Sequence, residues 1–162
     1  MLNIARLAAG SEGYYLNTIA HTVEDYYTGR GEAPGRWLGR QARELGLEGL
    51  VSADALRAVL AGVDPDSGEP LGSASNRRVP GFDLTFRPPK SVSLLWALGG
   101  REVSRTVSEA HDRAVEAAIG FLEDEVVVSR RGANGVETVE VDGVIAAGFR
   151  HRTSRADDPL LH

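Results

Sequence analysis

The pattern of hydrophobic and polar positions predicts a long amphipathic helix in the second half of the chain. From Glu102 to about Glu125, apolar residues recur at spacings of three and four, which places them on one face of an α-helix. They are Val103, Val107, Ala110, Ala114, Ala117 and Phe121.

Two segments in which apolar and polar residues alternate predict short strands. These are residues 2–7 and Phe82–Phe86; in the second, Asp83 and Thr85 point away from the face that carries the two phenylalanines. Two prolines then break the strand, and the apolar segment from Lys90 to Gly99 follows. Its periodicity fits a short helix or a strand, so this element stays open.

A hairpin is predicted towards the C-terminal end. Residues 136–141 and 144–150 alternate on either side of Asp142 and Gly143, a dipeptide that favours a tight β-turn. The last three residues, Leu160 to His162, resemble the opening of another strand.

The remaining segments predict helices and one long loop. Trp37 to Leu45 has helical spacing, and Ser52 is a suitable cap for a helix over Ala55–Ala61. Residues 64–81 are rich in Gly, Pro, Ser and Asp, which predicts a flexible surface loop. No βαβ unit repeats, so we expect an α+β fold, with helices packed on an antiparallel sheet that is incomplete in this chain.

Composition narrows the class of protein. The chain has 162 residues, 42% of them hydrophobic and 25% charged, as expected for one globular domain or part of one. No apolar run is long enough to cross a membrane, and no signal peptide is evident, which predicts a cytoplasmic location. The absence of cysteine excludes thiolate metal sites, so a metal would need His, Asp or Glu. The net charge of −5 does not decide for or against a nucleic-acid partner.

All four tyrosines occur in two doublets. These are Tyr14-Tyr15 and Tyr26-Tyr27, and the first lies in a segment that reads as a helix from Ser11 or Glu12. Adjacent helical residues point about 100° apart, so one tyrosine of each doublet can pack while the other faces a cleft. The doublets are therefore either aromatic packing or phenolic nucleophiles.

Two histidines and one aspartate are the other candidates for chemistry. His151 and His162 are eleven positions apart, and neutral imidazole is a common ligand for divalent ions. His21 and His111 are expected to be exposed to solvent. Asp83 either faces solvent or supports a ligand histidine, in which case we expect it beside His151 on a neighbouring strand and the same sheet face.

Two groups of basic and hydroxyl side chains are suited to contacts with phosphate or to a solvated loop. The first comprises Arg87, Lys90 and Ser91, and the second comprises Arg150, Arg152 and Arg155.

Taken together and in this order, these segments resemble a known family. The tyrosine doublets are followed by GRWLGRQARELGLEG, FDLTFRPPKSVSLLWAL, AHDRAV and FRHRTSRADDPLLH. Over nearly all of its length the chain is similar to the N-terminal relaxase domain of the MobF (TrwC/TraI-like) conjugative proteins, which are HUH endonucleases. The resemblance implies a palm-like antiparallel sheet with flanking helices, and residues 1–162 would be the N-terminal part of that single domain.

The resemblance also assigns roles to residues. Tyr14 matches the first nucleophile and Tyr26 the nucleophile of the second pair, with Tyr15 and Tyr27 as their doublet partners. His151 and His162 match two of three metal ligands, and the family's third ligand follows in a His-x-His pair of which His162 is the first member. A divalent ion (Mg²⁺, Mn²⁺ or Zn²⁺) is therefore expected only with that third histidine. Asp83 matches the acidic residue that orients a ligand or receives the tyrosine proton.

The implied activity is metal-dependent nicking and strand transfer on single-stranded or hairpin DNA at a transfer origin, through a phosphotyrosine intermediate. The full-length protein would carry a C-terminal helicase domain, and the 162 residues alone would be inactive. One departure is the spacing of the doublets: on one continuous helix Tyr14 and Tyr26 would lie ~18 Å apart. The alternatives are a rolling-circle replication initiator and a non-catalytic, truncated DNA-binding remnant.

Overall fold

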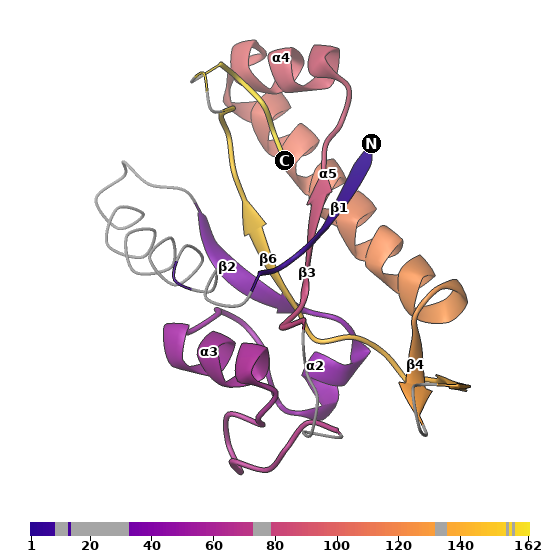
Figure 1. Ribbon diagram of the computed structural model, residues 1–162. Coiled ribbons are helices and arrows are strands. Elements are labelled where there is room, and N and C mark those ends of the chain that lie inside the picture. Colours follow the sequence, from indigo (N-terminus) through magenta and orange to yellow (C-terminus); the bar gives the residue numbers. More distant parts are fainter. Residues whose placement is uncertain (9–12, 14–32, 73–78, 132–135, 155, 157) are drawn as a thin grey trace.

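The computed structural model describes residues 1–8, 13, 33–72, 79–131, 136–154, 156 and 158–162. In this part of the chain the strands form three antiparallel pairs (Figure 1). The pairs are β1 (Leu2–Arg6) with β3 (Phe82–Phe86), β2 (Ala33–Leu38) with β6 (Ala146–Arg150), and β4 (Val128–Arg131) with β5 (Glu137–Glu140). The single sheet expected from the sequence is therefore divided into two-stranded ribbons among the described residues.

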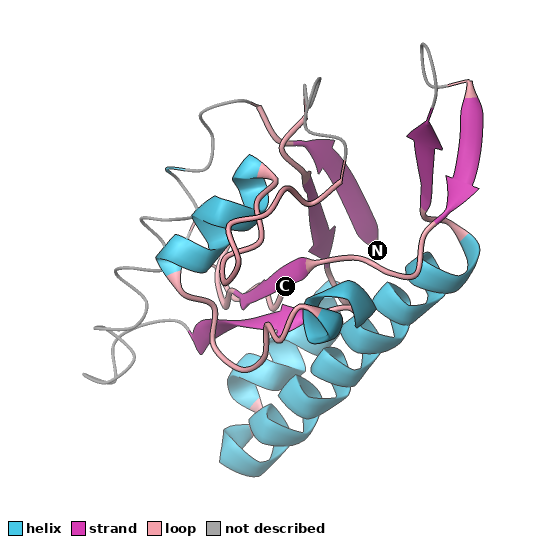
Figure 2. Cartoon of the chain, turned by 90° about the horizontal axis from the view of Figure 1, so that it is seen from below, coloured by secondary structure: helices cyan, strands magenta, loops and turns pink. Residues whose placement is uncertain are grey.

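Four helices lie around these ribbons in the described part of the chain. They are α2 (Arg40–Glu44), α3 (Ala53–Ala61), α4 (Lys90–Leu98) and α5 (Gly100–Glu125). Figure 2 shows α5 running along one side of the central strands and α3 lying on the opposite side. Within the described part of the chain, no helix is both long and apolar enough to span a membrane.

The pair β2–β6 presents a different face to each of these helices. Trp37 and Phe149 pack with the buried Val51 and Leu56 on the side of α3. Gly35 of β2 lies so close to Phe149 that an added Cβ would be 2.3 Å from its ring, so this position requires glycine. Because side chains alternate along a strand, the intervening residues of β2 and β6 point towards α5.

Ion pairs join this second face to α5. Arg150 at the end of β6 contacts Asp112 at 2.7 Å, and Arg36 of β2 contacts Glu116 at 3.0 Å. Arg36 also lies 3.9 Å from Asp112. The predicted helix is therefore fixed to both central strands by charged side chains, with Ile119 buried farther along. Most of the predicted apolar stripe is not part of this contact, because Ala110, Ala114, Ala117 and Phe121 are exposed.

Several predicted elements are confirmed. The strand Phe82–Phe86 has the predicted bounds. The Ser52 side chain accepts a hydrogen bond from the N–H of Ala55, as expected of a helix cap. The open segment after the two prolines is helix α4. In the predicted loop, residues 64–72 form hydrogen-bonded turns and a β-bridge between Val63 and Pro70, whereas residues 73–78 lie outside the described part.

Two predictions about secondary structure are wrong. Trp37 belongs to strand β2 rather than to a helix, because β2 pairs with β6 and Gly39, at φ 96°, separates the strand from α2. The predicted hairpin around Asp142-Gly143 does not form: β5 pairs with β4, and β6 pairs with β2. In both places a partner that is distant in sequence sets the pairing.

Glu123 of α5 is a buried carboxylate that binds the segment after β2 and the segment before β6. It is 7% exposed, and its Oε1 accepts hydrogen bonds from the backbone N–H groups of Arg40 at 2.6 Å and Val144 at 2.9 Å. Arg40 begins α2, and the preceding Gly39 has no side chain to cap it. A carboxylate from α5 therefore caps α2 and holds the turn that leads into β6.

Replacing Glu123 with Ala should destabilise the fold. The change removes the acceptor of two partly buried N–H groups, which should lower the free energy of unfolding by about 2–4 kcal/mol. Glu123→Gln retains an acceptor oxygen and should cost less. Urea denaturation of both variants measures the difference, with the exposed Glu125→Ala as control; equal effects of Glu123→Ala and Glu125→Ala would contradict the capping role.

Candidate functional site

His151 and His162 lie opposite each other in a short antiparallel segment, residues 151–162, which we call the histidine hairpin. The N–H of His151 donates to the carbonyl of His162 at 2.8 Å, and the N–H of His162 donates back to the carbonyl of His151 at 3.0 Å. Residues that exchange both hydrogen bonds place their side chains on the same side of the pair. A β-bridge between Thr153 and Pro159 continues the pairing.

The two imidazoles are placed to share one ion. Their ring centroids are 5.1 Å apart with planes inclined by 35°. With metal–nitrogen bonds of about 2.1 Å, two imidazoles on one ion have centroids roughly 4.5–5.3 Å apart. The Nδ1 of His162 lies 3.0 Å from the carbonyl of Leu160, which accepts its proton and leaves Nε2 for a ligand. These two residues therefore fit a divalent metal ion.

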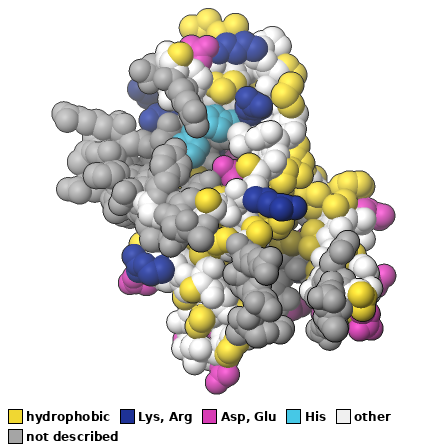
Figure 3. All heavy atoms as spheres, in the orientation of Figure 1, with side chains coloured by type: hydrophobic (Ala, Val, Ile, Leu, Met, Phe, Trp, Pro, Cys, Tyr) yellow, Lys and Arg dark blue, Asp and Glu magenta, His cyan; other side chains and the backbone are white. Residues whose placement is uncertain are grey.

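The described residues supply only part of a metal site. Among them, no group of three or more His, Cys, Asp or Glu side chains is arranged to hold an ion. His151 and His162 could thus provide two ligands, and a catalytic ion usually takes three from the protein. The space-filling view shows histidine side chains together on one face, with basic and acidic side chains nearby (Figure 3).

His111, on α5, was predicted to be exposed, and this is wrong. The residue is half-buried, because α5 packs along the strands at this point. Burial lowers its pKa, with Asp112 opposing the shift and the positive charges of Arg150 and His162 adding to it. His111 is therefore a neutral imidazole within electrostatic reach of the histidine hairpin at neutral pH.

The histidine hairpin is docked on the first turn of α4. Lys90 Nζ donates to Asp158 Oδ2 at 2.6 Å and to the carbonyl of Pro159 at 2.8 Å. The buried Ser93 Oγ accepts from the N–H of Leu161 at 3.2 Å, and Leu161 is itself fully buried. The lysine lowers the pKa of Asp158, so the carboxylate stays ionised opposite it.

Asp83 lies in β3, paired with Ala5 of β1. By alternation it shares a sheet face with Thr85, and Arg87 follows on the same side. The expected placement of Asp83 beside His151 on a neighbouring strand of one sheet is wrong for the described strands, since β3 pairs with β1 and β6 with β2. A role for Asp83 at the histidine pair therefore remains a prediction.

The residues predicted to contact phosphate differ in whether they already form ion pairs within the protein. Lys90 and Arg150 are already paired with Asp158 and Asp112. Arg87 forms no ion pair with the described residues. Its Nη2 lies 3.9 Å from the sulfur of Met1, and its Nε, like the Nε of Arg150, is buried with no hydrogen-bond partner among them. A buried guanidinium N–H of this kind is a natural site for an anion. Ser91 and Arg152 are exposed, and Arg155 lies outside the described residues.

The four tyrosines also lie outside the described residues. Tyr14, Tyr15, Tyr26 and Tyr27 therefore remain predictions from the sequence, as does their distance from the histidine hairpin.

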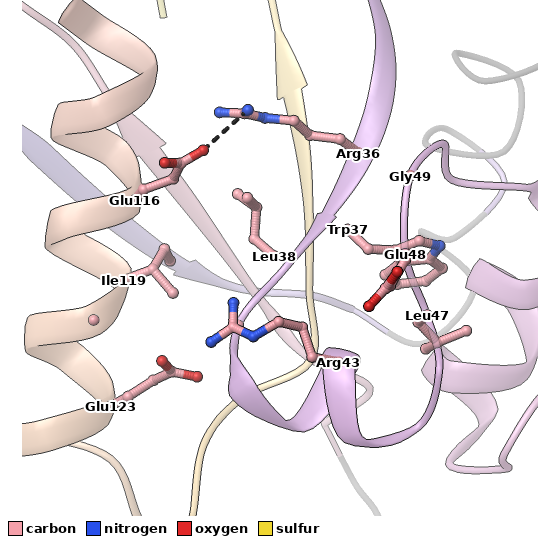
Figure 4. Close-up of a pocket in the computed structure, with 12 residues that line it drawn as sticks. Arg36, Trp37, Leu38, Arg43, Leu47, Glu48, Gly49, Glu116, Ile119 and Glu123 are labelled. Atoms are coloured by element: carbon pink, nitrogen blue, oxygen red, sulfur yellow. Dashed lines mark ion pairs between the residues drawn. The ribbon is translucent and has the colours of Figure 1, made fainter.

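A separate cavity of about 430 Å³ lies between α5 and the segment formed by β2 and α2 (Figure 4). Two carboxylates that line it already have partners: Glu116 forms an ion pair with Arg36, and Glu123 accepts a hydrogen bond from the start of α2. No residue of β3 or of the histidine hairpin lines it. We therefore place the candidate site at the histidine hairpin.

Sequence reasoning missed the residues that hold the hairpin in place. Ser93 and Asp158 carry no motif by themselves, but both lie inside the segments singled out for other reasons. The spacing of Lys90 and Ser93 could have indicated their shared role, because residues three apart lie on one face of a helix. It does so only once the segment is known to be helical.

The comparisons with known proteins agree on one family. A family model described as TrwC relaxase matches residues 8–162. Multifunctional conjugation protein TraI of Escherichia coli K12 is 38% identical over 165 residues, which covers all of this chain and 9% of that protein. A second TraI from Escherichia coli is 37% identical, covering 96% of this chain and 8% of the relative.

Solved structures give the same answer. The conjugative relaxase TrwC in complex with oriT DNA, in a copper-bound form, superimposes with a TM-score of 0.79 at 32% identity. That match covers 99% of this chain and 55% of the TrwC chain. A metal-bound structure of TrwC with oriT DNA gives a TM-score of 0.78 at 31% identity, with 99% and 54% covered. The present chain spans about half of the TrwC chains and less than a tenth of the TraI relatives, and it belongs to the TrwC relaxase family.

Proposed function

We propose that this chain is part of a relaxase domain that nicks one DNA strand at a transfer origin and remains joined to its 5′ phosphate through a tyrosine. The observation that carries the proposal is the paired arrangement of His151 and His162, which fits two ligands of one divalent ion in a chain of this family. The chemistry is a transesterification, so the energy of the broken bond is retained.

The step balances as follows. The phenol oxygen of Tyr14 bonds to phosphorus, the bond from phosphorus to the 3′ oxygen breaks, and the leaving 3′ oxygen takes up a proton. Asp83 accepts the phenol proton directly or through water, since a phenol with a pKa of ~10 needs a base at neutral pH. When bound, the divalent ion neutralises negative charge that gathers on the phosphate oxygens. Return of the 3′ hydroxyl reverses the reaction.

We propose Arg87 as a contact for the DNA backbone near this step. Arg87 directly follows β3, the strand that carries Asp83, and its buried Nε has no hydrogen-bond partner among the described residues. It precedes Lys90, which contacts the histidine hairpin. Arg152, Arg155 and Ser91 are further candidates for phosphate contacts. Trp37 packs in the core beside α3, and the indole N–H of Trp96 donates to Ser108 Oγ.

A direct experiment is to look for the covalent intermediate. The full-length protein, incubated with Mg²⁺ or Mn²⁺ and labelled single-stranded oligonucleotides from the DNA that flanks its gene, should form a DNA adduct that survives SDS. His162→Ala should reduce adduct formation strongly, since it removes a proposed ligand, while the exposed Arg101→Ala should not. No adduct with any oligonucleotide from that region, from folded protein, would contradict the proposal and favour a non-catalytic remnant.

A rolling-circle replication initiator is the less favoured alternative, because the matched relatives are conjugation proteins. The length of those relatives supports further domains after this one in the full protein, and we propose a helicase among them. We further propose that the nicking takes place in the cytoplasm.

A further inference from the structure

We infer that Lys90 and Ser93 of α4 are positioning residues for the two histidines, a role that rests on the proposed metal site. Helix α4 contacts the returning part of the histidine hairpin, residues 158–162, near both of its ends. In Figure 1 the segment after β6, drawn in yellow, rises to α4 and returns towards the C-terminus. The first turn of α4 meets this returning segment.

Lys90 holds the hairpin near its tip. Its ammonium donates to both the Asp158 carboxylate, at 2.6 Å, and the carbonyl of Pro159, at 2.8 Å. These two charge-assisted hydrogen bonds, to neighbouring residues, fix the backbone at Asp158 and Pro159. A single exposed ion pair would not fix it. The N–H of Ser154 donates to the carbonyl of Asp158 at 2.9 Å, so both strands of the hairpin are tied to the residue that Lys90 holds.

Ser93 holds the hairpin beside the ligand itself. Its side chain is fully buried and accepts the N–H of Leu161, the residue before His162. Leu161 is fully buried too, and because neighbouring side chains in a strand point to opposite faces, its burial turns His162 to the other side. The hydrogen bond and the buried leucine thus determine which way the imidazole faces.

The consequence is a preorganised ligand pair. Replacing a residue that orients a metal ligand through a hydrogen bond commonly lowers metal affinity by about 10–100-fold. The contacts of Lys90 with Asp158 and Pro159 indicate that it acts on the histidines rather than as a phosphate contact. Arg87 differs from Lys90 in this respect, because its guanidinium has no acidic partner among the described residues.

Mn²⁺ titration calorimetry on the full-length protein tests this role. Lys90→Met keeps the aliphatic stem and removes the charge, and it should weaken Mn²⁺ binding by about 10-fold or more. Lys90→Arg restores a cation that can reach the carboxylate and should recover most of the affinity. Arg101→Met, which removes an exposed cation at the start of α5, should leave binding unchanged. Thermal melting of each variant without metal checks that the fold is intact.

A double-mutant cycle identifies the partner. If Lys90 acts through Asp158, Asp158→Asn should weaken binding as well, and the double variant should lose little more than either single variant. Mn²⁺ affinity that is unchanged in Lys90→Met, or lost only together with the fold, overturns the positioning role. In that case His162→Ala still reports on the proposed site: weak binding by His162→Ala keeps the proposed function, whereas wild-type affinity in His162→Ala contradicts it.

Discussion

Full-length protein carrying Tyr14→Phe should lose initial nicking by about 10³-fold or more, as loss of a catalytic nucleophile generally costs. Its affinity for the DNA should be unchanged, because the aromatic ring remains and only the nucleophilic oxygen is gone. The measurements are the yield of SDS-resistant adduct with a labelled oligonucleotide and the DNA affinity by fluorescence anisotropy. Tyr26→Phe is the matched variant in the other doublet, and we expect it to retain the first nick.

Other outcomes reassign the nucleophile. Undiminished adduct in Tyr14→Phe would pass the role to Tyr15, Tyr26 or Tyr27, and the three single variants would then be compared. Loss of DNA affinity along with nicking would instead mean that Tyr14 binds or packs, as aromatic side chains commonly do. The four tyrosines lie outside the described residues. The experiment therefore identifies which tyrosine is the nucleophile.

Local patterns predicted the elements whose structure depends on local interactions. The apolar stripe of α5 and the Ser52 cap of α3 require only the spacing of neighbouring residues, and both elements form where expected. The strand Phe82–Phe86 alternates over its whole length and is ended by two prolines. In each case one short stretch of sequence contains the whole signal.

Pairing between distant segments was beyond local patterns. Trp37 has neighbours at helical spacing, yet it forms part of β2 because a partner strand more than a hundred residues later supplies the hydrogen bonds. The Asp142-Gly143 dipeptide favours a turn, yet the buried Glu123 holds the following Val144 and directs the chain into β6. Tertiary contacts decided both, as they often do when local preference is weak.

The candidate site shows the same division. His151 and His162 were named from the ligand chemistry of imidazole, and the resemblance then matched them to two metal ligands, but their spacing in sequence does not place them opposite each other. The reciprocal backbone hydrogen bonds of the histidine hairpin do, together with its docking through Lys90 and Ser93. His111 was missed as a neighbour because an isolated histidine on a helix gives no sign of what packs against it.

The 162-residue protein by itself should bind Mn²⁺ more weakly than a version extended through the next histidine, by more than about 100-fold. The backbone of His162 is fixed by two hydrogen bonds to His151 and its Nδ1 by Leu160, so fraying is not the main reason. The reason is ligand number: two imidazoles leave the ion short of a protein ligand, and losing a ligand costs more than the 10–100-fold typical of residues that only orient one. Isothermal titration of both proteins, with His151→Ala in the longer one as a matched two-ligand control, measures the difference. Equal, tight binding by the short and long proteins would show that the described residues complete the site, and the three-histidine interpretation would have to be abandoned.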